Sequence, residues 1–156
     1  MSHEIATMAY TGKAPWHGLG NALPPHQSLE TWAEKAGLNW KILSSPVRYI
    51  NNHSQYFNEV LSFEGQNVLY RSDNLLPLSV VSDRYKIVQP FEILEFYRDL
   101  AEYAGFELET AGVLRSGRKI WALARTGQTG IVKGSDRTDG YVLLATACDG
   151  TLATTA

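Results

Sequence analysis

The chain has 156 residues, of which 44% are apolar and 19% are charged, and its formal net charge is −2. This length and composition predict a folded domain with a real hydrophobic core, and they exclude a disordered chain and a uniformly basic nucleic-acid coat. The single cysteine, Cys148, excludes an intramolecular disulfide and fits a reducing compartment. We recognise neither a secretion signal nor an apolar run long enough to span a membrane, so we expect a soluble, cytoplasmic protein.

The N-terminal part of the chain predicts an irregular arm followed by a short helix and a strand. Residues 1–27 are rich in Gly, Pro, Asn and His without helical or strand periodicity, which is typical of irregular structure. A single α+β domain is then expected over residues 28–156. Its first helix is predicted over 29–36, because Ser28 suits an N-cap and Gly37 a stop. Residues 40–50 predict an extended strand with an edge or a bulge at Pro46.

The middle of the chain predicts a hairpin, a strand and the longest helix. The hairpin is expected over residues 56–71, with its turn at Glu64 and Gly65. The apolar run 76–82 predicts a buried strand. Pro90 at a first helical position and Gly105 as a stop predict a helix over 90–104. We expect the stripe of this helix that faces the core to contain Ile93, Tyr97, Leu100, Ala101 and Ala104.

Three strands close the chain, at residues 106–114, 118–125 and 141–147. The last is apolar on both faces, which is typical of a central strand. The expected fold class is therefore α+β, a mostly antiparallel sheet with one long and one short helix packed on one face. Because little chain follows the last strand to cover its far face, we also expect self-association, with a homo-oligomer as the result.

Neither catalysis nor metal or cofactor binding is indicated. His17 has no second ligand at a metal-binding spacing, and Cys148 has no identifiable histidine partner. The glycines of WHGLG (residues 16–20) are followed by Pro24 and Pro25 rather than by the start of a helix, which argues against a phosphate cradle. We therefore expect a protein that is not an enzyme, holds no metal or cofactor, and uses WHGLG as a structural turn.

Charge is unevenly distributed along the chain. Residues 1–112 carry a net charge of −5, and residues 113–156 carry +3. Strand alternation places Lys119, Trp121 and Arg125 on one face, with same-face neighbours roughly 6.6 Å apart, close to the nucleotide spacing of an extended single strand. Backbone charge and base stacking are the attractions that a single-strand groove offers. The alternative is a solvated strand with Trp121 in the core. The expected nucleic-acid-binding residues are Arg115, Arg118, Lys119, Trp121, Arg125, Lys133 and Arg137.

Three motifs resemble a known family. WHGLG, the run VVSDRYKIVQPFEILEF (residues 80–96) and the run YVLLATACDGTLAT (residues 141–154) are similar to elements of the phage/plasmid-like proteins grouped as domain-of-unknown-function family 932. The motif residues are Trp16, His17, Gly18, Gly20, Asp83, Arg84, Tyr85, Asp149 and Gly150. Many relatives have His where this chain has Cys148. The resemblance implies a mobile-element origin, no assigned activity, and a match to the N-terminal part of a longer family fold.

Two functions remain open at this point. The strand-strand-strand-helix order over residues 40–104 also resembles the core of phage single-strand annealing proteins, which is an analogy of topology. Together with the basic strand face, it favours a phage or plasmid protein that binds nucleic acid in recombination or replication. We expect this nucleic acid to be single-stranded. The alternative is a protein-binding module that inhibits or regulates a host factor, such as a defence system, through its acidic part. We expect no membrane association in either case.

Overall fold

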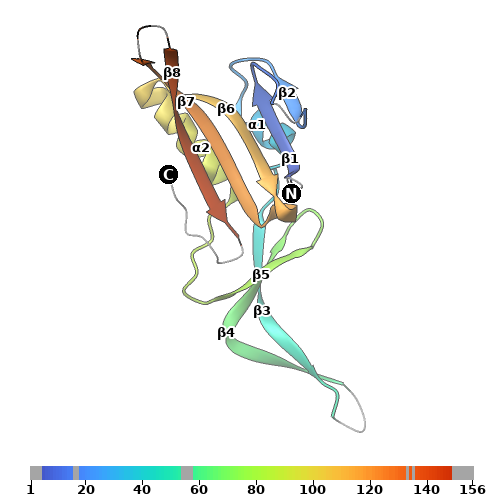
Figure 1. Ribbon diagram of the computed structural model, residues 1–156. Helices are drawn as coiled ribbons and strands as arrows, with labels where there is room; N and C mark the ends of the chain where they lie inside the picture. Colours follow the sequence, from blue (N-terminus) through green and yellow to red (C-terminus); the bar gives the residue numbers. More distant parts are fainter. Residues whose placement is uncertain (1–4, 16–17, 54–57, 133, 135, 149–156) are drawn as a thin grey trace.

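A computed structural model describes residues 5–15, 18–53, 58–132, 134 and 136–148, with the side chains of 101, 128–129, 131–132 and 136–138 left aside. The larger sheet has the strand order β2-β1-β6-β7-β8 and the smaller one the order β3-β4-β5 (Figure 1). The larger sheet contains β1 (Ile5–Thr11), β2 (Asn21–Leu23), β6 (Glu107–Leu114), β7 (Lys119–Val132) and β8 (Asp136–Ala147). The smaller sheet contains β3 (Ile42–Asn51), β4 (Glu59–Arg71) and β5 (Pro77–Ser82). The helical elements are α1 (Leu29–Ala36), α2 (Pro90–Ala104) and the short 3₁₀ turn η1 (Arg115–Gly117).

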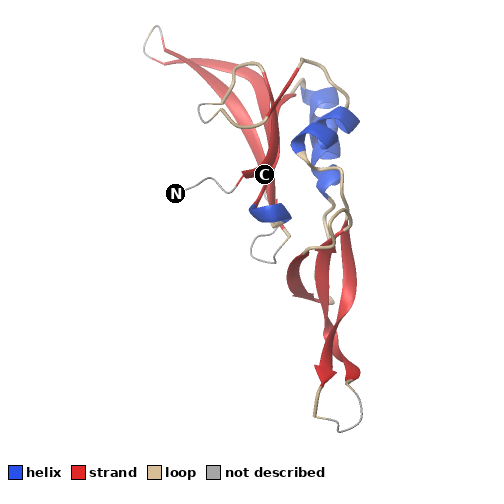
Figure 2. Cartoon of the chain, turned by 90° about the vertical axis from the view of Figure 1, so that its right-hand side faces the viewer, coloured by secondary structure: helices blue, strands red, loops and turns tan. Residues whose placement is uncertain are grey.

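The two α-helices lie on one face of the larger sheet, and the smaller sheet extends from one end of the molecule (Figure 2). Strands β1 and β2 pair in parallel, whereas the other described pairings are antiparallel. This arrangement confirms the expected α+β fold with a long and a short helix on one face. The core lies between helices and sheet, and its members include Trp32, Leu94, Tyr97, Ala111, Val113, Ile120, Ala122 and Leu144.

The short helix forms as predicted. The Ser28 side chain accepts a hydrogen bond from the Thr31 backbone N–H at 3.3 Å, which caps the helix N-terminus. Gly37 ends the helix in the left-handed region with φ 75°, where a side chain at Cβ would also lie 2.0 Å from Thr7 Oγ1. Trp32 and Ala36 are buried against the sheet. Local capping and close packing therefore determine where α1 begins and ends.

The long helix also forms over the predicted residues, but its buried stripe is different. Ile93 and Tyr97 are buried as expected. Leu94, which the prediction left out, is 0% exposed, while Leu100 is only partly buried. Ala104 is exposed, and so it was wrongly assigned to the core. Residues 102–104 are exposed, so the covered stripe ends before them; the side chain of Ala101, also expected in the core, lies outside the described part of the structure.

The prediction of an irregular N-terminal arm over residues 1–27 was wrong, because two strands of the larger sheet lie there. β1 pairs with β6, and Ala9 lies opposite Ala111. Thr7 points toward α1 and donates a hydrogen bond from its hydroxyl to the Ala36 carbonyl oxygen at 2.9 Å. Met8 points to the opposite face. Small and polar residues in β1 hide the alternation that identifies a strand.

The predicted hairpin over residues 56–71 was also wrong over its described part, which is one continuous strand, β4. Its hairpin partner is β3, since Val47 pairs with Phe63 and Pro46 pairs with Asn67. The intervening residues 64–66 therefore form a bulge, with Gly65 at φ 82°. Pro46 lies at this bulge and on an edge strand, as its residue type predicts.

Two strand environments also differ from the predictions. β8 is an edge strand of the described sheet rather than a central one, and Leu143 is 52% exposed. The central strand is β6, with β1 and β7 on either side of it. β5 is likewise an edge strand with one covered side, since Val81 is buried and its neighbour Val80 is 55% exposed. Apolar composition alone did not distinguish a covered strand from an uncovered one.

Candidate nucleic-acid interface

β7 places the predicted residues on the sheet face that points away from the helices, here called the outer face. Ile120, Ala122 and Ala124 are buried in the core on the helix side. Because side chains alternate along a strand, Lys119, Trp121 and Arg125 lie on the outer face. Lys119 and Trp121 are half-buried and Arg125 is exposed. The shared face is as predicted, and the alternative that placed Trp121 in the core is wrong.

Neighbouring strands contribute further apolar and aromatic side chains to the outer face. Arg125 lies opposite Tyr141 of β8, and Leu123 lies opposite Leu143. Tyr141 is 45% exposed and Leu143 is 52% exposed. Sequence reasoning missed Tyr141 because it treated β8 as apolar on both faces. The signal was present in the alternation of the strand, which places positions 141, 143 and 145 on one side.

Gly112 of β6 lies on the outer face between the side chains of Met8 and Trp121, which both pack against it. A Cβ atom at Gly112 would lie 2.7 Å from the Thr7 carbonyl oxygen, 2.8 Å from Met8 Cβ and 3.1 Å from Trp121 Cζ2. The absence of a side chain therefore allows both neighbours to lie close to the sheet. Met8 is only 3% exposed. The outer face is thus covered at β1 and open at β7 and β8.

The glycines of WHGLG help to cover β1. Gly18 donates a backbone hydrogen bond to the Pro15 carbonyl oxygen at 3.0 Å, which closes a turn. A Cβ atom at Gly20 would lie 2.6 Å from Met8 Cγ, so the chain packs directly on this side chain. Trp16 and His17 lie outside the described residues. The described part of the motif therefore acts as a turn packed on the outer face.

Arg125 is held by an acid on the adjacent strand. Its Nη2 atom lies 3.2 Å from Glu109 Oε1, and the charge of Glu109 is the main cause that raises the pKa of Arg125. Glu109 sits where the register between β6 and β7 shifts, between Leu108 and Thr110. Its other carboxylate oxygen, Oε2, is buried without a hydrogen-bond partner among the described residues. Arg125 thus shares its charge with Glu109.

The other basic residues divide between the two ends of β7. Arg115 and Arg118 line an open groove beside η1, together with Ile5 and Pro77. Arg71 fixes this turn, because its Nη1 atom donates to the Ser116 carbonyl oxygen at 3.0 Å. The Arg71 guanidinium lies 4.3 Å from the centre of the Trp40 ring and forms a salt bridge of 2.6 Å with Asp73. Lys133 lies outside the described residues, as does the side chain of Arg137.

Asp83, Arg84 and Tyr85, here called the DRY motif, follow β5, and the tyrosine connects the two sheets. The Tyr85 hydroxyl donates to the Ala147 carbonyl oxygen at 2.9 Å. Asp83 Oδ1 accepts a hydrogen bond of 2.6 Å from the Asn67 side chain, whereas Arg84 is exposed. Asp83 therefore has a structural role beside the smaller sheet and Tyr85 has one at the junction, and sequence reasoning did not separate these roles from binding. Asp149 and Gly150 lie outside the described residues.

The described residues contain no group of three or more His, Cys, Asp or Glu side chains placed to hold a metal ion. The expectation that the protein holds no metal stays a prediction, since His17 is outside this part of the chain. Among the described helices, none is long and apolar enough to cross a membrane.

Fold and interface together define an α+β sheet protein with one face closed by helices and the other face bearing cationic and aromatic side chains. The chain belongs to the family described as a domain of unknown function (DUF932), whose family model matches residues 77–156. This match includes the DRY motif and β6–β8, and WHGLG lies before it. Neither a curated protein nor a solved structure matches the chain.

Proposed function

We propose that the protein binds single-stranded nucleic acid along the outer face of its larger sheet. The observation that carries this proposal is the position of Trp121, which lies between Lys119 and Arg125 on a strand whose opposite side is the core. Same-face neighbours are about 6.6 Å apart, so the three residues span about 20 Å of β7, enough for several nucleotides. A binding face of this kind combines cations for phosphates with rings for bases.

The shape and charge of the face support a single strand rather than a duplex. The outer face is an open sheet surface, which allows splayed bases to stack on rings. Tyr141, beside Arg125, supplies a second ring. The acidic remainder of the chain, with a net charge of −5 over residues 1–112, disfavours binding elsewhere on the molecule.

Glu109 sets the strength of binding at one end of the face. A phosphate that approaches Arg125 competes with the Glu109 carboxylate, which lies 3.2 Å from the guanidinium. Replacing Glu109 by Gln removes the competing charge and keeps a side chain of similar size. We therefore expect E109Q to bind single strands more tightly than the wild type does. A solely structural role of the pair predicts no gain in affinity.

The biological setting that we propose is a phage or plasmid protein of recombination or replication, without enzymatic activity, acting in the host cytoplasm. The similarity of the three motifs to phage/plasmid-like proteins supports this setting. The order of β3, β4, β5 and α2 also supports it, by analogy with single-strand annealing proteins.

Fluorescence anisotropy with a labelled single-stranded oligonucleotide, repeated over a range of salt concentrations, tests the proposal. K119A and R125A should each weaken binding and reduce the slope of log affinity against log salt by roughly 0.7. W121A should lose about 1–3 kcal/mol of binding free energy with little change in slope, because stacking releases no counterion. K35A is the matched control, since it removes the same charge from α1 on the other side of the sheet.

Two results would contradict the proposal. One is the absence of wild-type affinity for single-stranded DNA or RNA at low salt. The other is an equal loss of affinity in K35A and K119A, which would indicate attraction by net charge alone. In the first case, a module that regulates a host protein becomes the better interpretation.

A further inference from the structure

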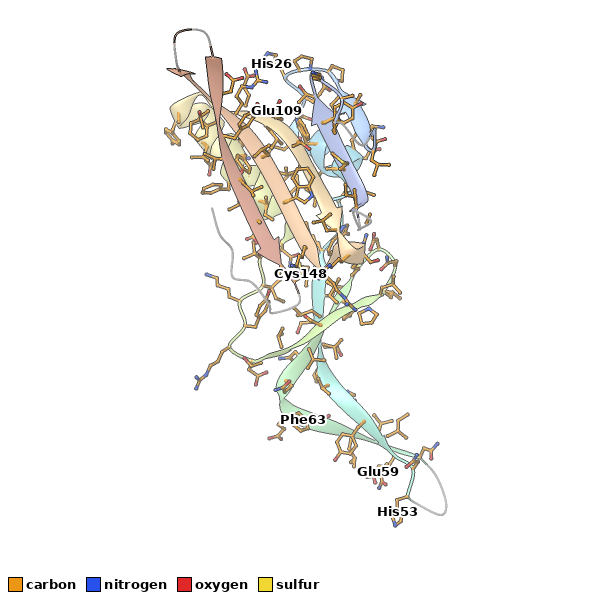
Figure 3. All side chains as sticks on the ribbon, in the orientation of Figure 1. His26, His53, Glu59, Phe63, Glu109 and Cys148 are labelled. Carbon is orange, nitrogen blue, oxygen red and sulfur yellow. The ribbon has the colours of Figure 1, made fainter. Side chains whose placement is uncertain are left out.

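A two-stranded ribbon projects from the smaller sheet. It comprises residues 47–51 of β3 and 59–63 of β4, beyond the bulge at Gly65, and is called the ribbon below. Phe63 and Glu59 lie along it, far from the larger sheet (Figure 3). Two-stranded hairpins are marginally stable in water without a packed face. A projecting ribbon of this length therefore points to a covering partner.

One face of the ribbon is apolar. Val47 pairs with Phe63 and Tyr49 pairs with Leu61, so all four side chains lie on the same face. Tyr49 is 51% exposed and Phe63 is 55% exposed. Paired, solvent-exposed aromatic and aliphatic side chains of this kind mark an interaction surface. At its outer end this face carries one charged residue, Glu59, paired with Asn51.

A groove of suitable chemistry lies elsewhere on the same chain. It is formed by the segment before α2, by α2 itself and by β8, and it has a volume of about 430 Å³. Ile87, Val88 and Leu144 line it, and Phe96, 41% exposed, stands at its side. Its apolar lining matches the apolar face of the ribbon.

Charge also matches between ribbon and groove. Lys86 lines the groove and is exposed. Glu92 also lines the groove, and its carboxylate accepts a hydrogen bond of 2.5 Å from the Gln89 backbone N–H at the start of α2, where the helix N-terminus stabilises negative charge. Lys86 is therefore the side chain of the groove that can form an ion pair with Glu59 of the ribbon.

From these two surfaces we propose that the ribbon of one copy docks, apolar face down, in the groove of a second copy of this chain. The ribbon extends away from the body that carries the groove, so it does not reach the groove of its own chain (Figures 1 and 3). The partner is a second copy because one chain carries both complementary surfaces. The contact is heterologous, since two different surfaces meet. It leaves the outer face of β7 free.

Complementation between two variants tests this contact by light scattering after size exclusion. The ribbon variant F63S and the groove variant F96S each alter an exposed side chain, and each alone should elute with the mass of one chain. Their equimolar mixture should form a heterodimer, because each variant keeps the surface that the other lacks. I50S is the matched control: Ile50 lies on the opposite ribbon face and is 60% exposed, so this variant should associate like the wild type.

Several outcomes would overturn the proposal. A wild type that stays monomeric over a wide concentration range would mean that the ribbon binds another partner or none. Ribbon-to-ribbon pairing would appear as association of F96S alone and as a mixture that forms no heterodimer. Thermal unfolding of each variant identifies misfolding. Where misfolding occurs, disulfide formation between F63C and F96C, with I50C in place of F63C as control, measures the same contact. A lack of cross-linking above the I50C background would likewise overturn it.

Discussion

Tyr97 connects the long helix to two strands, and its hydroxyl offers a direct test of the packing. The side chain is 2% exposed, and its hydroxyl oxygen lies 2.7 Å from the carbonyl oxygens of both Ala122 and Val142. The single hydroxyl hydrogen donates to one of them at a time. Y97F removes this donor and keeps the ring. A lost hydrogen bond costs about 0.5–1.5 kcal/mol of stability, and a buried polar group left without a partner costs about 1–3 kcal/mol. We therefore expect Y97F to lose about 1–2 kcal/mol in the free energy of unfolding.

The same residue predicts a dependence on pH. Burial raises the pKa of Tyr97 from 10.0 to about 12. Between these values the unfolded state loses the phenolic proton first, so the contribution of Tyr97 to stability falls as the pH rises. That contribution is complete below pH 10 and disappears as the pH passes about 12. The advantage of the wild type over Y97F should therefore shrink across this alkaline range.

Urea unfolding at neutral pH and at several alkaline values measures both effects. A loss of about 1–2 kcal/mol corresponds to a fall of roughly 2–8 °C in Tm for a chain of this size. Y103F is the control, because Tyr103 is 88% exposed and should affect neither quantity. Equal stability of Y97F and wild type at neutral pH would refute the role of the hydroxyl. A constant difference across the alkaline range would refute the effect of burial on its pKa.

Two further predictions concern packing. L94A should lose about 2–5 kcal/mol of unfolding free energy because Leu94 is 0% exposed. L100A should lose less because Leu100 is only partly buried. If denaturant titration gives equal losses for the two variants, the buried face of the helix is assigned wrongly. G112A should lose about 1–3 kcal/mol because its Cβ would lie 2.7 Å from the Thr7 carbonyl oxygen. In the control G130A, no atom of the described residues lies within 4 Å of the added Cβ, and thermal unfolding should leave it near the wild type.

Both helices could be predicted because their signals are local. Ser28 and Gly37 act within one turn of α1, and their cap geometry depends on adjacent backbone alone. Pro90 and Gly105 delimit α2 in the same way. Tertiary context changed only the buried stripe of α2, since it is the sheet that decides which side chains are covered.

The strands that prediction missed depend on distant partners. β1 is a strand because β6, about a hundred residues away, pairs with it, and no residue in β1 shows this. Gly65 has the positive φ that a hairpin turn also requires, so the residue itself does not distinguish a turn from a bulge. The distinction comes from β3, which pairs with β4 on both sides of Gly65.

For the candidate interface, sequence alternation predicted which side chains share a face but not which face is covered. The answer depends on the helices, which pack on the side of Ala122 and leave Trp121 outside the core. Glu109 was not predicted as the partner of Arg125, because a register shift in β6 brings the two together. A pattern that assumes regular strands does not predict contacts that arise from irregular strand pairing.

The salt bridge between Arg125 and Glu109 makes the two ends of the proposed interface unequal in their affinity for phosphate. Arg125 must exchange a carboxylate for a phosphate, and this exchange reduces the net gain of its contact. Lys119 lies at the other end of the face, next to Arg118 and the groove beside η1, so a phosphate there meets two cations in succession. K119A should therefore weaken binding more than R125A does. In the E109Q background the loss caused by R125A should grow toward that caused by K119A, because a phosphate at Arg125 no longer has to displace a charged group.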